Sequence, residues 1–209
     1  MRDDFLTAAR SAAGLLHDSR VSAAWAEPSA LPEFSVGGLA AHLAFQVIAL
    51  PDMLAAPEPT ESVIPVLEHY TRAAWVGAAL DEEINVRIRT GGESIAAQGP
   101  SAVAAQLDDA IEKVAAALTT MANRPVRLPL WGPWSLLVDD YLLTRMMELT
   151  VHSDDLAVSV SMPTPELPPA VTEPVLGLLM TLSVRRHGPT NVLRALSRAE
   201  RAPGTIAAF

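Results

Sequence analysis

Cysteine is absent from this chain of 209 residues. Its absence excludes disulfide bonds, thiolate metal ligands and a cysteine nucleophile. Any thiol chemistry must therefore use a thiol that enters from outside the protein. Lysine is scarce as well: Lys113 is the one lysine among 15 basic residues, and this bias towards arginine suggests a GC-rich genome.

Basic residues are too few to balance the acidic ones, so the formal net charge is −9 and the isoelectric point is near 4.9. An acidic surface argues against nucleic acid and anionic membranes as partners. The first ten residues, MRDDFLTAAR, lack the apolar stretch of a secretory signal. Because no run of 18 apolar residues is present to span a membrane, we expect a cytoplasmic protein. Phosphate-binding motifs of the P-loop and GxGxxG types are missing too.

Strand-like runs are few, whereas alanine is abundant and half of the residues are hydrophobic. Glycine and proline fall mostly in connections, so the pattern predicts an all-α protein with a sizeable core. Helices are predicted over residues 2–18, 35–50, 61–98, 101–122, 139–157, 171–186 and 190–198. An alternative for part of the third helix is a short strand at 84–88 with its turn at Gly91 and Gly92. The proline-rich segments 124–134 and 162–174 are predicted to be an extended connection and a loop.

The predicted helix Asp139–Ala157 carries charged side chains on a surface that should be buried. It has no glycine or proline, and its apolar residues go nearly all the way round, which is typical of a core helix. Arg145, Glu148 and His152 nevertheless share one stripe, with Glu148 and His152 one turn apart at i and i+4. Ionisable groups seldom enter a core unless they are paired or bind a metal.

A second histidine, His42, lies on the apolar helix predicted at 35–50. Taken locally, a core histidine with a satisfied ring nitrogen is the simpler interpretation. Together with Glu148 and His152, however, it would complete a set of two histidines and one glutamate. Such a set suits Zn²⁺ with open coordination positions, or Fe(II) in a facial triad. The second and fifth helices of an antiparallel bundle can face each other, and metal sites are built in that way.

The other histidines favour structural or surface roles. His17 and His187 fall at predicted helix ends, where a cation suits the helix dipole and where a glycine follows His187. His69 has polar neighbours in the sequence, and we expect it to be exposed.

Two further groups of residues leave alternatives open. Trp131 and Trp134 either line the mouth of a pocket or pack onto the bundle, and packing is the simpler expectation. Arg194, Arg198 and Arg201 share one face of the last predicted helix. That face is either solvated or part of an anion-binding lid, and solvation is again the simpler expectation.

Two stretches, SVGGLAAHLA (35–44) and TRMMELTVHSDDLA (144–157), resemble the signatures of the DinB-like superfamily. More narrowly, they resemble the metal-binding domain of the actinobacterial, mycothiol-dependent maleylpyruvate isomerase family. The resemblance covers residues 1–158 and implies an antiparallel four-helix bundle, to which residues 159–209 add a packed helical extension. It also implies one divalent metal, expected to be zinc, with His42, Glu148 and His152 as ligands. Mycothiol would then be the cosubstrate.

The resemblance predicts a metal- and mycothiol-dependent isomerase or S-transferase that acts on a small electrophile. Arg145 would then steady the ligand Glu148 or a substrate carboxylate, and Asp155 would accept a hydrogen bond from His152 behind the metal. Both residues would otherwise be simple ion-pair partners within the helix. The rival hypotheses are a non-catalytic metal- or ligand-binding bundle and an Fe(II)-dependent oxygenase. The expected partners are a small thiol and a substrate, and a homodimer is left open.

Overall fold

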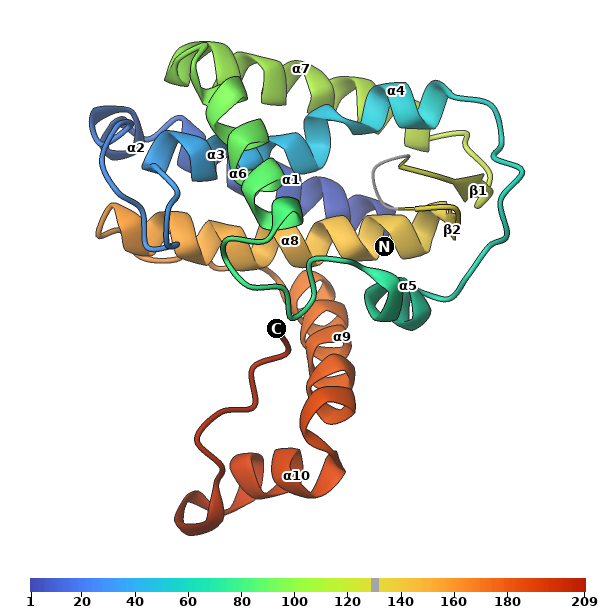
Figure 1. The fold of residues 1–209 in the computed structure, drawn as a ribbon. Helices are drawn as coiled ribbons and strands as arrows, with labels where there is room; N and C mark the ends of the chain where they lie inside the picture. Colours follow the sequence, from blue (N-terminus) through green and yellow to red (C-terminus); the bar gives the residue numbers. More distant parts are fainter. Residues whose placement is uncertain (129–131) are drawn as a thin grey trace.

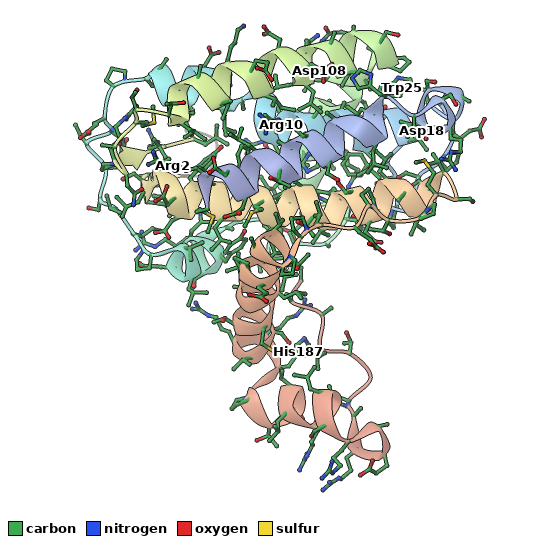
Figure 2. All side chains as sticks on the ribbon, turned by 180° about the vertical axis from the view of Figure 1, so that it is seen from behind. Arg2, Arg10, Asp18, Trp25, Asp108 and His187 are labelled. Carbon is green, nitrogen blue, oxygen red and sulfur yellow. The ribbon has the colours of Figure 1, made fainter. Side chains whose placement is uncertain are left out.

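Four long helices form the bundle at the centre of the computed structural model, which describes residues 1–128 and 132–209 (Figure 1). They are α1 (Arg2–Leu16), α3 (Val36–Ile48), α7 (Pro100–Leu118) and α8 (Val138–Ser159). Helices α1 and α3 each pack against both α7 and α8, so the four helices enclose one core. Figure 2 shows α1 lying between α7 and α8 when the bundle is seen from behind. The predicted all-α fold is confirmed.

Shorter elements connect and flank these helices. They are α2 (Ser19–Ala23), α4 (Leu50–Ala55), α5 (Val66–Arg72), α6 (Glu83–Ala96), β1 (Pro125–Val126), β2 (Leu136–Leu137), α9 (Pro169–His187), α10 (Pro189–Ser197) and the 3-10 helix η1 (Ala199–Arg201). Strands β1 and β2 form one antiparallel pair in which Pro125 lies opposite Leu137. A proline is tolerated here because the pair has only two strands and both are edges.

Helix α3 begins where its sequence predicts. The Ser35 hydroxyl accepts a hydrogen bond from the Gly38 amide at 2.8 Å, which satisfies one of the free N–H groups at the helix start. Leu39 and Leu43 of α3 are fully buried. They belong to the same core cluster as Leu142 and Met146 of α8, so the faces of α3 and α8 meet in the interior.

Helix α6 crosses α3 at a very short distance, and glycine makes this crossing possible. A Cβ atom on Gly92 would lie 2.7 Å from the backbone oxygen of Gly38, closer than real Cβ atoms come. The Glu93 carboxylate accepts hydrogen bonds from the amide and hydroxyl of Ser35 at 3.0 and 2.8 Å. The crossing places α6 beside the half of α3 that carries His42.

The long helix predicted over residues 61–98 is wrong. The chain forms α5, then an irregular segment over residues 73–82, and then α6. Gly77 has φ +79°, a left-handed conformation that interrupts a right-handed helix. The alternative strand at 84–88 is wrong as well, because these residues are helical and the register runs through Gly91 and Gly92.

The predicted loop at 162–174 ends earlier than expected, because α9 starts at Pro169 and includes Pro174. Proline suits the first turn of a helix, where the missing amide hydrogen would have no partner. Pro174 lies one turn further on, where it costs one backbone hydrogen bond near the helix start. The irregular part of the segment is therefore limited to the residues before Pro169.

One segment nevertheless passes a test for a membrane span by length and composition. Residues Val36–Ala55 are long and apolar enough by composition, with a mean hydropathy of 1.4. This segment comprises α3 and α4, and 61% of its most apolar window is buried inside the protein. A core helix of a packed bundle passes the same test, so its burial accounts for its composition.

Helices α9 and α10 project from the bundle as an arm, with His187 near their junction (Figures 1 and 2). The base of the arm packs through α9 against α1 and α8. After η1 the chain returns, and the Phe209 ring lies 4.8 Å from the Trp75 ring, centroid to centroid. The C-terminal tail thus contacts the irregular segment between α5 and α6.

Candidate metal centre

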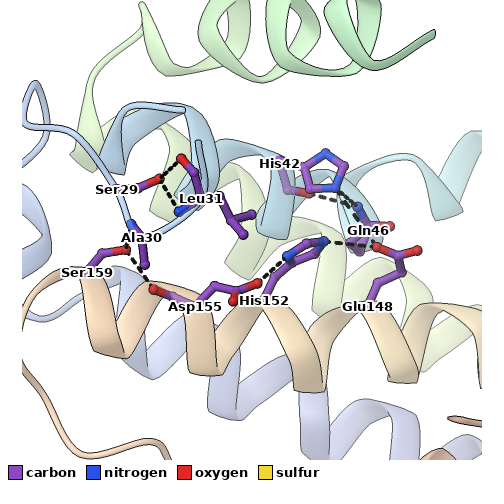
Figure 3. A network of polar contacts seen from close by, with 9 residues as sticks. All are labelled: Ser29, Ala30, Leu31, His42, Gln46, Glu148, His152, Asp155 and Ser159. Atoms are coloured by element: carbon purple, nitrogen blue, oxygen red, sulfur yellow. Dashed lines mark hydrogen bonds and ion pairs between the residues drawn. The ribbon is translucent and has the colours of Figure 1, made fainter. Parts of the chain in front are cut away.

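His42 from α3 faces Glu148 and His152 from α8 across the interface between the two helices (Figure 3). The His152 Nε2 atom lies 3.1 Å from Glu148 Oε2, and the His42 Nε2 atom lies 4.0 Å from the same oxygen. The histidine rings meet edge to face with their centroids 5.0 Å apart. The predicted contact between the second and fifth helices expected from the sequence, at 35–50 and 139–157, is therefore present as the contact between α3 and α8.

The three side chains can each offer one ligand atom, and these atoms lie within 4.8 Å of one another. Zinc binds imidazole nitrogen at about 2.0–2.1 Å, so tetrahedral ligands lie about 3.4 Å apart. The pair formed by His152 and Glu148 is already at that spacing. A shift of about 1 Å of the His42 ring would bring the third atom to it. Two imidazoles and one carboxylate are a donor set that fits a divalent ion with open positions.

Asp155 holds the far side of the His152 ring. Its Oδ2 atom lies 2.9 Å from His152 Nδ1, one turn further along α8. A carboxylate in this place accepts the Nδ1 hydrogen and leaves Nε2 directed towards Glu148, which is the usual support of a metal-binding histidine. The structure thus places Asp155 behind the candidate ligand His152.

Arg145 is buried and links Glu148 to α3. Its Nη2 atom lies 3.8 Å from Glu148 Oε1, its Nη1 atom donates a hydrogen bond to Gln46 Oε1, and its guanidinium lies over the Tyr141 ring at 5.4 Å. The Gln46 amide in turn donates to the His42 carbonyl at 3.0 Å, and its nitrogen lies 3.2 Å from His42 Nε2. Arg145 therefore orients Gln46 against His42.

The charges of this cluster shift the pKa values of its members. Burial lowers the pKa of His42 to about 4, and the positive charge of His152 acts in the same direction. Burial disfavours the charged forms of Glu148 and His152. Their mutual hydrogen bond and the neighbouring charges favour the charged forms more strongly and decide the direction of both pKa shifts. The pKa of Glu148 falls to about 2, and hydrogen bonds to Asp155 and Glu148 raise that of His152 to about 9. At neutral pH without a metal, Glu148 is thus ionised and His42 is neutral, which are the states that bind a metal ion. His152 is protonated and must lose one proton before it can act as a ligand.

The candidate ligands open into a cavity of about 290 Å³. The cavity is mostly apolar and is built from α3, α6, α8 and the segment after α5. Its other lining residues include Phe34, Phe45, Gln46, His69, Trp75, Ile84, Arg87, Ile88, Leu128 and Arg145. A small molecule that entered it would reach the three ligand atoms from the solvent side.

His69 is buried, and the expectation that it is exposed is wrong. It is 2% exposed, lines the cavity and accepts a hydrogen bond at Nδ1 from Trp134 Nε1 at 3.2 Å. Burial and the charge of Arg145 lower its pKa to about 4. Its polar neighbours Glu68 and Arg72 pair with each other and are exposed, so they do not indicate the burial of the ring between them in the sequence.

Other sequence candidates lie elsewhere. Trp134 is buried and packs in the core, whereas Trp131 falls outside the described residues. His17 ends α1 and is exposed, and His187 ends α9 in the arm. The arginines at 194, 198 and 201 are exposed on the arm, so the structure does not bring them to the cavity.

Sequence reasoning missed Gln46, His69, Trp75 and Arg87 as residues of the site. Only Gln46 carried a usable signal, because it lies one turn after His42 on an otherwise apolar helix. The other three lie on α5, on the segment after it and on α6, and no local pattern predicts how these elements pack around the cavity.

Comparison with known proteins agrees with the helical fold. The family model described as the mycothiol maleylpyruvate isomerase N-terminal domain matches residues 5–157. A solved structure, "Crystal structure of the mycothiol-dependent maleylpyruvate isomerase", superposes with a TM-score of 0.52 and 17% identity over 88% of this chain and 69% of that chain. No curated protein matches the sequence. With its matched bundle spanning α1 to α8, this chain belongs to the mycothiol maleylpyruvate isomerase N-terminal domain family.

Proposed function

We propose that this protein is a divalent-metal-dependent isomerase or S-transferase that uses mycothiol as a cosubstrate and acts on a small electrophile. The observation that carries the proposal is the convergence of His42, Glu148 and His152 on the wall of an open cavity. Family membership and the lack of cysteine in the chain support an external thiol.

The three convergent side chains would hold the ion, which we propose to be Zn²⁺. Three protein ligands leave at least one coordination position open towards the cavity. A bound divalent ion would convert an incoming thiol, with an ordinary pKa near 8.5, to its thiolate at neutral pH. The apolar walls formed by Phe34, Phe45 and Trp75 would exclude water from the reacting sulfur.

The remaining polar residues of the cluster act as positioning residues in this proposal. Asp155 fixes the ring orientation of His152, and Arg145 holds Glu148 and Gln46 in place. The thiolate sulfur would add to an electrophilic carbon of a carbon–carbon double bond, whose π electrons move towards the electron-withdrawing group of the substrate. In an isomerisation, rotation about the former double bond follows, and the same electrons re-form the double bond and expel the thiolate. In an S-transfer the C–S bond persists, and the adduct takes up the proton that the thiol had lost.

The alternative is a non-catalytic metal- or ligand-binding bundle with a structural or regulatory role. One observation favours it: both ring nitrogens of His152 have partners within the protein, Asp155 and Glu148. A buried network satisfied in this way can serve the fold alone.

Metal analysis and spectroscopy separate the two candidates. We expect one divalent ion per chain, most of which is lost in His42→Ala and retained in His17→Ala, a control far from the site. Mycothiol added to the Co²⁺-substituted protein should produce a sulfur-to-metal charge-transfer band. If no band appears and no electrophile is consumed with mycothiol present, the enzyme proposal fails and the binding-protein alternative replaces it.

A further inference from the structure

A second compartment of about 240 Å³ opens next to the candidate metal centre. Four residues line both spaces: His42, Phe45, Arg87 and Ile88. The second compartment lies between α3 and α6, and the shared residues form its boundary with the first. One small molecule can therefore extend from the metal centre into the second compartment.

The second compartment is apolar, and Gly91 forms part of its wall. Phe45 from α3 and Ile88 and Ile95 from α6 contribute its apolar walls. A Cβ atom on Gly91 would meet nothing within 4 Å, in contrast to Gly92, which packs against the backbone of α3. Helix packing thus requires a glycine at position 92 and not at position 91, which is exposed and lines the compartment.

Arg87 provides a charge at the boundary between the two compartments. It is exposed, and within the described parts of the chain its guanidinium has no hydrogen-bond or ion-pair partner. Arg89, two residues on, is paired with Glu33 at 2.7 Å, and Arg145 is engaged by Gln46 and Glu148. Arg87 lies at a cavity wall and has no carboxylate partner among the described residues. Such a guanidinium is suited to bind the carboxylate of a ligand.

We infer that the second compartment binds the apolar body of a small carboxylate, whose anionic group pairs with Arg87. The identification of this ligand as the substrate rests on the proposed function. The binding of the ligand in the compartment does not depend on that function. The substrate class is then an electrophile with an apolar body and a carboxylate, placed with its reactive end towards His42 and the metal centre.

Binding of unreactive probes tests the inference on the full chain. Hexanoate, hexanamide and acetate are titrated by calorimetry, without thiol and after chelation of metals. Hexanoate should bind more tightly than hexanamide, which lacks the charge, and more tightly than acetate, which lacks the apolar body. Each methylene buried adds about fourfold in affinity, and an exposed charge pair adds up to about fivefold.

Two variants, each with a matched control, assign these preferences to residues. Arg87→Gln should abolish the preference for hexanoate over hexanamide, while Arg186→Gln, the same change at an exposed position on the arm, retains it. Gly91→Leu should weaken hexanoate binding at least fivefold and leave acetate unchanged, while Gly177→Leu on α9 changes neither. Leucine has a higher helix propensity than glycine, so we expect Gly91→Leu to fold. Gly91→Met, which also adds a large side chain at this position, provides a second test.

The inference is overturned if Arg87→Gln keeps the preference for the carboxylate, or if filling position 91 leaves hexanoate affinity unchanged. Its failure is distinguishable from failure of the proposed function, because the probes bind without metal and thiol. A missing charge-transfer band with the expected probe binding would remove only the enzyme proposal. A charge-transfer band with no selectivity for hexanoate would remove only the compartment.

Discussion

At the scale of single residues, the candidate centre depends on side chains that hold other side chains. Asp155 and Glu148 bond the two nitrogens of His152, and Gln46 connects Arg145 to His42. Each contact reduces the freedom of a candidate ligand before any ion arrives. Loss of a supporting residue should therefore weaken metal binding without removing a ligand.

Asp155→Asn tests this support. We expect its affinity for Zn²⁺ to fall about 10- to 100-fold, because the amide no longer fixes the tautomer and orientation of the His152 ring. Competition with a chromophoric chelator measures the dissociation constant. Asp154→Asn, the same change at an exposed neighbour, serves as the control. Equal affinities of the two variants would mean that Asp155 is a simple ion-pair partner.

His69 predicts a pH dependence of stability. Its pKa is lowered to about 4 in the folded protein, chiefly by burial, so below pH 6.5 the unfolded chain binds more protons than the folded one. The free energy of unfolding should therefore fall as the pH drops from 6.5 to 4, by at most about 3 kcal/mol from this residue. Urea denaturation of the metal-free protein at several pH values measures the loss.

His69→Gln keeps an acceptor for Trp134 and removes the titrating ring. Its stability should change less over the same pH range than that of the unaltered protein. His17→Gln, at an exposed position, is the control. A pH profile of His69→Gln that parallels that of the unaltered protein would contradict a neutral, buried His69.

At the scale of elements, the crossing of α3 and α6 creates the cavity. The two helices approach closely because Gly92 has no side chain to meet the Gly38 backbone. This approach brings Arg87 and Ile88 of α6 to the side of α3 that carries His42 and Phe45. The cavity therefore depends on a glycine that touches no candidate ligand.

Adjacent glycines provide a matched pair of variants for this crossing. Gly92→Ala should lower the free energy of unfolding by about 1–3 kcal/mol, because a Cβ there forces the helix backbones apart. Gly91→Ala should leave it unchanged or raise it by about 0.5–1 kcal/mol, since alanine favours the helix and meets nothing. Urea denaturation compares the two. Equal effects would show that the close crossing tolerates a side chain.

At the scale of the whole molecule, a continuous apolar core holds the bundle without help from a metal. The described core runs from Phe5 in α1 to Leu182 in α9 and includes residues of every long helix. Small zinc domains unfold without their ion because they lack such a core. The bundle should behave differently, with the ion adding to a fold that already exists.

Metal removal tests this independence. The chelated protein should keep its far-UV circular dichroism and unfold cooperatively. Zn²⁺ at 100 times its dissociation constant should add about 2.7 kcal/mol to the free energy of unfolding. Thermal denaturation with and without the ion measures the gain, and His42→Ala should show little of it. A chain that loses its helices on chelation would contradict a preformed bundle.

Much of the fold was predictable from local pattern. The all-α class, the start of α3 at Ser35 and the extent of α8 follow from composition, an N-cap residue and an uninterrupted helical period. The error at 61–98 arose because the apolar spacing of α6 was extended backwards across Gly77, where only the folded backbone shows a positive φ. The exposure expected for His69 was wrong because its polar neighbours Glu68 and Arg72 pair with each other at the surface, whereas the His69 ring is enclosed beside Trp134 and Tyr70.

The sequence by itself determined the relations within a helix. Glu148, His152 and Asp155 must lie on one stripe, because the helical period places residues three and four apart on the same side. Only the tertiary structure decided what faces that stripe. The approach of His42 and Arg87, and the enclosure of His69, depend on how helices distant in the chain pack, and packing is set by many side chains at once.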